Sequence, residues 1–196
     1  MHTSTLDVLD FWFGPTDDPG HGQPRKAWFV KDPAFDAEIN RRFGPLIEQA
    51  LVGGIDDWLT QPLDALPALA RVIVLDQFTR NVFRNTARAF AGDAAALQTA
   101  RALVATGADR SLTSVQRSFV YLPFEHAEDI SMQQQSLNLF DGLAAEHPAL
   151  GEAALWAHKH QQVVQRFGRY PHRNTILGRQ STPEELAFLA QPGSSF

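Results

Sequence analysis

Apolar residues recur three and four positions apart along most of the chain, which is the spacing of amphipathic helices. No stretch alternates strictly between apolar and polar residues for long enough to predict a strand. The pattern predicts helices over residues 5–13, 33–52, 63–83, 93–106, 113–128, 131–145, 150–167 and 183–190. The apolar run 72–75 is also compatible with a buried strand, but the residues after it continue the helical register, so a helix is expected there.

Several of these helices have clear start signals. Asp32 is expected to cap the second helix with Pro33 in its first position, and Thr182 and Glu185 form a capping box at the last. Thr113 with Gln116 shows the same capping pattern. The connections are short and no low-complexity linker divides the chain, so residues 1–196 are expected to form one helical domain. We expect an all-α fold of about seven or eight helices stacked as antiparallel hairpins.

Composition excludes several classes of function. The chain has no cysteine, so it can form no disulfide and no thiolate can act as a nucleophile or a metal ligand. No apolar run approaches the ~20 residues that cross a bilayer, so a cytoplasmic protein without a membrane partner is expected. The net charge of −5 argues against nucleic acid as the main partner. A homo-oligomer is possible on this sequence.

Charge is distributed unevenly along the chain. The segment 153–183 contains no acidic residue and carries five basic ones, which leaves −10 for the remainder. A second acid-free window, 77–92, contains three arginines. The basic residues of the two windows are Lys159, Arg166, Arg169, Arg173, Arg179, Arg80, Arg84 and Arg88.

These arginines have two interpretations. The planar guanidinium binds carboxylate or phosphate through two parallel hydrogen bonds, which indicates a site for an anionic ligand. Alternatively, the arginines pair with acidic residues elsewhere in the chain and serve only the packing of the helices. Arg166 and Arg169 lie near a helix C-terminus, where they can also bond the last carbonyl groups; this structural role is favoured for Arg166, and the ligand site for Arg173.

His126 and His160 fall on apolar helical stripes and should point toward the core. His126 with Glu125 or Glu128 is the candidate acid/base pair, although inward histidines more often have a structural role. Motifs for metal binding, phosphate-binding loops, dinucleotide binding and serine hydrolases are absent, so neither a metal nor a cofactor is expected.

Several sequence stretches resemble a known bacterial family. They are residues 8–14, 28–29, 75–84, 86–91, 121–126, 166–174 and 177–182. Across residues 6–189 the chain is similar to the bacterial domain-of-unknown-function family 924, which belongs to the tetratricopeptide-like all-α superfamily. Thr79 and Ala127 depart from the pattern, where proline and serine are common.

The resemblance implies stacked helical hairpins and supplies no activity. Its polar positions are Asp76, Gln77, Arg80, Asn81, His126, Arg169, His172, Arg173, Asn174 and Arg179. From the residues we predict a binding module that holds an anionic small molecule or peptide group. The predicted ligand-binding residues are Arg80, Asn81, Arg84, His126, Arg169, His172, Arg173, Asn174 and Arg179. The alternatives are a hydrolase, with or without a metal, that uses His126 with Glu125 or Glu128, and a purely structural Arg/Asp/His network.

Overall fold

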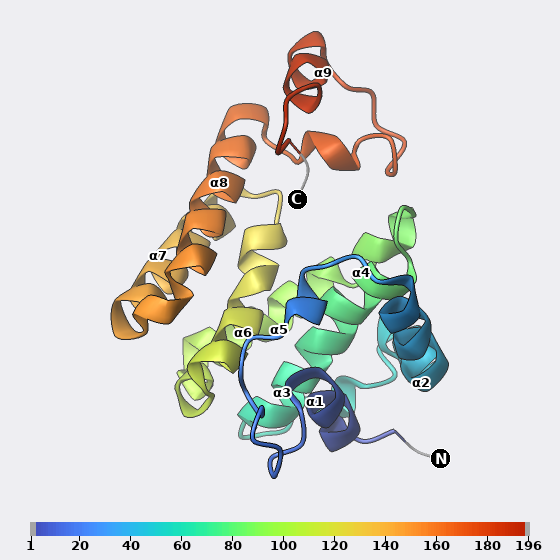
Figure 1. The fold of residues 1–196 in the computed structure, drawn as a ribbon, viewed down its shortest axis with the longest axis vertical. Coiled ribbons are helices and arrows are strands. Elements are labelled where there is room, and N and C mark those ends of the chain that lie inside the picture. Colours follow the sequence, from blue (N-terminus) through green and yellow to red (C-terminus); the bar gives the residue numbers. More distant parts are fainter. Residues whose placement is uncertain (1–2, 195–196) are drawn as a thin grey trace. The chain divides into compact units, whose positions relative to one another are not determined.

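The computed structural model describes residues 3–194, and within them every regular element is helical (Figure 1). This confirms the predicted all-α class. The α-helices are α1 (Thr5–Phe13), α2 (Pro33–Leu51), α3 (Ala65–Val72), α4 (Thr79–Val82), α5 (Asp93–Thr106), α6 (Ser114–His126), α7 (Ile130–Glu146), α8 (Gly151–Phe167) and α9 (Pro183–Leu189). Short 3₁₀ turns lie between many of them. No helix in the described part of the chain is long and apolar enough to cross a membrane.

The chain divides into two compact units. The first contains the residues up to Arg84 together with Arg88–Pro123, and the second contains Asn85–Ala87 together with the residues from Phe124 onward. α1 to α5 and most of α6 belong to the first unit, whereas the last turn of α6 and all of α7, α8 and α9 belong to the second.

The first unit has an aromatic core. Trp12 and Phe13 at the end of α1 are fully buried, and the Trp12 ring contacts Phe78 and Phe119 with centroids 5.6 and 5.7 Å apart. Edge-to-face contacts of this kind stabilise a core beyond the apolar area that they bury. Most of the N-terminal aromatic residues therefore pack inside the first unit. Phe29 is an exception, since 74% of it is exposed.

The predicted helix 63–83 contains a π-helical segment. After α3, the residues Ile73–Phe78 adopt π-helical hydrogen bonding and α4 follows directly. All six π-helical residues are buried. The Thr79 hydroxyl donates to the Leu75 carbonyl at 2.8 Å, and Arg80 donates to the Asp76 carbonyl at 2.8 Å. Side chains thus satisfy carbonyl groups that the wider turn leaves without an α-helical partner.

The second unit is built on the hairpin of α7 and α8. The two 17-residue helices are joined by a short 3₁₀ turn, Pro148–Leu150, and lie side by side (Figure 1). α8 ends at Gly168, which adopts the left-handed conformation at φ 70° and donates to the Val164 carbonyl at 2.7 Å. Tyr170 follows and is fully buried against Val163 and Val164. The chain after α8 is therefore held in place, and it carries most of the predicted site residues.

Candidate functional site

The C-terminal end of α6 is the base of a polar cluster in the second unit. The amide nitrogen of the fully buried Gln133 lies 2.7 Å from the carbonyl oxygens of both Glu125 and Ala127. The Tyr170 hydroxyl also donates to the Glu125 carbonyl. Carbonyl groups at a helix end lack partners within the helix. Gln133 of α7 and Tyr170 therefore donate hydrogen bonds to these carbonyl groups and hold the C-terminal end of α6 in place.

His160 on α8 contacts the same end of α6. Its Nδ1 lies 2.9 Å from the Trp156 carbonyl oxygen and 3.2 Å from Oε1 of Glu125. Both His160 and Glu125 are buried. Burial lowers the pKa of His160 to about 3, and the charges of Arg173 and the neighbouring histidines act in the same direction. His160 is therefore neutral near pH 7, with Nδ1–H placed to donate to Trp156.

The segment after α8 is an ordered loop that leads to α9. Pro171–Arg173 forms a 3₁₀ turn, and Asn174 after it is fully buried. The Asn174 amide donates to the Ser181 hydroxyl at 3.0 Å and to Glu185 at 3.2 Å, while its Oδ1 accepts from Arg179 at 3.0 Å. Asn174 thus joins the loop to the start of α9, and its role in the structure is to hold the loop.

Two predicted site arginines form paired forks with glutamates. Arg179 donates to both carboxylate oxygens of Glu128 at 2.5 and 2.9 Å, and the Tyr170 backbone N–H donates to the same carboxylate at 2.8 Å. Arg169 makes the equivalent pair with Glu185 at 2.7 and 2.8 Å. Such bidentate pairs orient both partners.

The pairs also control the charge of the two glutamates. Burial alone would raise the pKa of Glu128, but the hydrogen bonds from Arg179 and from the Tyr170 backbone, with the charges of Arg179 and Arg173, lower it overall. The Arg169 hydrogen bond is the main cause that lowers the pKa of Glu185 to about 2. Both carboxylates are therefore ionised at neutral pH.

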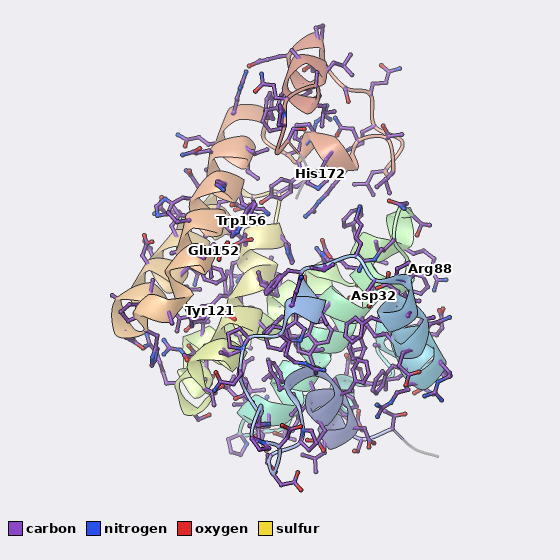
Figure 2. All side chains as sticks on the ribbon, viewed as in Figure 1. Asp32, Arg88, Tyr121, Glu152, Trp156 and His172 are labelled. Atoms are coloured by element: carbon purple, nitrogen blue, oxygen red, sulfur yellow. The ribbon has the colours of Figure 1, made fainter. Side chains whose placement is uncertain are left out.

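Arg173 is the most deeply buried of the predicted ligand-binding arginines in this unit. It is 6% exposed, and its guanidinium carbon lies 4.5 Å from the centroid of the Tyr170 ring. The neighbouring His172 lies on the turn between α8 and α9 (Figure 2). Burial lowers the pKa of His172 to about 4, and the charge of Arg173 is the next cause. His126 and His172 are half-buried, so both reach solvent beside these more deeply buried groups.

The remaining predicted site residues lie in the first unit. Arg80 pairs with Asp76 at 3.0 Å and with Asp93 at 2.9 Å, on the π-helical segment and the start of α5. Arg84 donates to both oxygens of Asp36 on α2 at 2.5 and 2.9 Å, and the Asn81 amide donates to Asp36 at 2.7 Å. These three residues therefore connect α2, α4 and α5.

The structure thus brings together Glu125, His126, Glu128, His160, Arg169, His172, Arg173, Asn174 and Arg179 within one unit. The sequence pattern predicts no role for Tyr170 or Gln133, and for Glu185 it predicts only the capping box of the last helix. Tyr170 lies inside the stretch 166–174 that resembles the family, and nothing in its local pattern indicates which groups it contacts. No pattern in the sequence connects Gln133 with the end of α6. Across the described residues, no group of three or more acidic residues and histidines is arranged to hold a metal ion.

The chain is thus an all-α protein with an Arg/His/Glu cluster in its second unit. The family described as bacterial protein of unknown function (DUF924) matches residues 8–193, so the chain belongs to that family. A solved structure of a protein of unknown function from Agrobacterium tumefaciens is similar, with 39% identity and a TM-score of 0.82. The match covers 95% of this chain and 96% of that one. No curated protein matches the chain.

Proposed function

We propose that the protein binds an anionic group of a small molecule or peptide in the second unit, at Arg173 together with His126 and His172. The observation that carries this proposal is the burial of Arg173 directly after His172, which reaches solvent, in one turn of the second unit. The charge of His126, at the end of α6, acts on His172. A guanidinium in a desolvated place attracts a carboxylate or phosphate much more strongly than one in water. Its face lies on the Tyr170 ring, which leaves the N–H edges of the fork as its donors.

His172, which its lowered pKa keeps neutral near pH 7, suits such a site. A neutral imidazole has one N–H donor and one acceptor nitrogen, and a bound anion would favour the protonated form. Asn174 and Arg179 hold the loop that carries Arg173, so they position the site in this proposal. The buried arginine is thereby held by the fold before any ligand arrives, which reduces the entropic cost of binding.

Titration with inorganic phosphate and with malonate, followed by amide NMR shifts, tests the proposal. We expect saturable shifts for residues 126 and 170–174. Arg173→Lys keeps the charge but loses the bidentate fork, so it should weaken binding about tenfold or more. Arg166→Gln is the control, because Arg166 is exposed and pairs with Glu184 at 2.9 Å. No saturable shift in this loop, or equal affinity in Arg173→Lys, would overturn the proposal.

A structural role is the second candidate, and it is supported by the ion pairs. Arg80, Arg84, Arg169 and Arg179 each contact a carboxylate at 3.0 Å or less. Residues paired in this way hold helices and loops together, and removing one partner leaves a partly buried charge behind. Arg84→Gln should then lower the free energy of unfolding without changing anion binding in the second unit. Unchanged stability would contradict this role for Arg84.

In the proposed hydrolase alternative, Glu125 is a better candidate for the acid/base carboxylate than Glu128. Glu128 is held ionised by Arg179 and the Tyr170 backbone, so it is unsuited to donate a proton near neutral pH. Glu125, buried and 3.2 Å from His160, is the better placed carboxylate. Hydrolysis of phosphate or carboxylate esters that is lost in Glu125→Gln would favour this alternative.

We also propose a tetratricopeptide-like stacking of the hairpins and a cytoplasmic site of action. The hairpin of α7 and α8 supports the first, since antiparallel neighbours joined by a short turn are the unit of such folds. The absence of cysteine supports the second, because oxidising compartments favour disulfide-containing chains.

A further inference from the structure

A separate pocket lies in the first unit, at the C-terminal end of α1. It has a volume of about 590 Å³, which is in the ~300–1,000 Å³ range of pockets that enclose small ligands. Its walls come from α1, from the loop 14–25 and from α2. None of its lining residues belongs to the polar cluster of the second unit.

The loop that forms one wall is fixed to the helix. Arg25 donates to the carbonyl groups of Phe11 and Trp12 at 2.7 and 2.9 Å, and His21 Nδ1 lies 2.6 Å from the Gly14 carbonyl. The Gly22 N–H donates to the Phe13 carbonyl at 3.1 Å. These bonds satisfy carbonyl groups at the helix end and hold the loop beside α1. The pocket is therefore a feature of the folded chain.

Arg42 gives the pocket a cationic wall. Its guanidinium carbon lies 4.9 Å from the centroid of the half-buried Phe11 ring and 5.2 Å from that of Phe43. With the residues that the structure describes, Arg42 makes no ion pair or hydrogen bond, in contrast to the paired arginines above. A guanidinium whose face rests on aromatic rings keeps its N–H edges for a ligand.

Asp10 supplies an opposite charge in the same pocket. Like Arg42, its carboxylate has no hydrogen-bond or ion-pair partner in the part of the chain that is described. The side chains of Asp10 and Arg42 line the same cavity, and they form no ion pair with each other. The complement of such a pocket is a molecule with a carboxylate at one end and an ammonium group at the other. The Phe11 ring lines the same pocket and favours an apolar side chain on that molecule.

We propose that this pocket binds a small apolar zwitterion, an amino acid or a short peptide, through Arg42 at its carboxylate and Asp10 at its ammonium group. Asp18 also lines the pocket, but its carboxylate already accepts from the Gly20 N–H at 2.7 Å and so is less available. The proposal concerns a second site and stands apart from the anion site at Arg173.

Calorimetric titration of the full chain with the dipeptide Leu-Phe tests the proposal. N-acetyl-Leu-Phe lacks the ammonium charge and Leu-Phe amide lacks the carboxylate, so each should bind about tenfold more weakly or worse than the unmodified dipeptide. Free leucine and phenylalanine, titrated in parallel, show whether a single residue is enough. Equal affinity for the three peptides, or no saturable binding of the dipeptide or of either amino acid at millimolar concentration, would overturn the proposal.

Two neighbouring arginines provide a matched pair of variants. Arg42→Gln should weaken dipeptide binding about tenfold or more, because a charge-assisted hydrogen bond is lost. Arg41→Gln removes the same charge from the next residue, which is exposed and pairs with Glu38 at 2.6 Å, and should leave binding unchanged. Equal affinities in the two variants would refute the role of Arg42. Arg173→Lys should not affect the dipeptide, so the two proposed sites can fail independently.

Discussion

Gly92, the residue before α5, lies against the π-helical segment. A Cβ atom at this position would lie 2.1 Å from the Leu75 carbonyl oxygen, whereas ordinary C···O contacts are about 3.3 Å or longer. The atoms in conflict are backbone, so no side chain can rotate away. Gly92→Ala must therefore move the start of α5 away from the π-helical segment or distort that segment.

The cost can be worked out from the contacts. Overpacking a core typically costs ~1–3 kcal/mol, and the required backbone shift places this substitution at the upper end. The Leu75 carbonyl also accepts the Thr79 hydroxyl at 2.8 Å, and disturbing that bond adds about 1 kcal/mol. We expect Gly92→Ala to lower the free energy of unfolding by about 3–4 kcal/mol.

Urea unfolding followed by tryptophan fluorescence is a suitable assay, since three of the four tryptophans, Trp12, Trp28 and Trp58, belong to the first unit. Gly142→Ala is the matched control. Gly142 lies within α7, and its added Cβ would meet no atom within 4 Å, so helix propensity should stabilise the variant by ~0.5–1 kcal/mol. Because α7 lies in the second unit, circular dichroism should follow this control. A loss below about 1 kcal/mol for Gly92→Ala would refute the reasoning.

Three further predictions concern buried polar groups and a helix cap. Because the pKa values of His160 and His172 are lowered to about 3 and about 4, the unfolded chain takes up more protons than the folded chain below pH ~6.5. The free energy of unfolding should therefore have its full value above that pH and be lower by about 2 kcal/mol per histidine at pH 5. An unfolding free energy that stays constant from pH 7 to 5 would contradict this. Tyr121→Phe removes the hydroxyl that donates to the buried Asp109 at 2.7 Å, so urea unfolding should show a loss of ~1–3 kcal/mol, and an unchanged midpoint would argue against it. Thr182→Ala breaks the capping box of α9 and should cost about 1 kcal/mol, measured as faster amide hydrogen exchange in the first turn of that helix; unaltered exchange would count against the cap.

Local signals in the sequence predicted the helices well. Asp32 caps α2 with Pro33 in its first turn, and the reciprocal hydrogen bonds between Thr182 and Glu185 confirm the predicted capping box. Thr113 and Gln116 make the same pair of bonds at 3.0 and 3.3 Å. These features depend on residues two or three apart, so the local sequence contains all the information that they need. The π-helical segment was not predicted, because apolar spacing looks alike in both helix types over one turn.

The partners of the arginines depend on the tertiary fold. Arg84 meets Asp36 across 48 positions, and Arg179 meets Glu128 across 51. An acid-free window shows only that its arginines have no acidic partner within that stretch of the sequence. The windows include Arg173, but an acid-free window cannot distinguish a deeply buried arginine from exposed arginines near it in the sequence. The contact between Glu125 and His160 was likewise out of reach, because it joins two helices through their packing.

The π-helical segment has a consequence for how relatives of this chain can diverge. A turn of this kind holds one residue more than the corresponding α-helical turn, so it corresponds to a single inserted position within the helix 65–82. Deleting one residue from 73–78 would restore regular α-helical bonding and rotate everything before it by about 100° relative to α4. The buried face of α3 would then no longer match that of α4. An alignment gap at this point would therefore mark a family member in which the packing of α3 has been rebuilt with other residues.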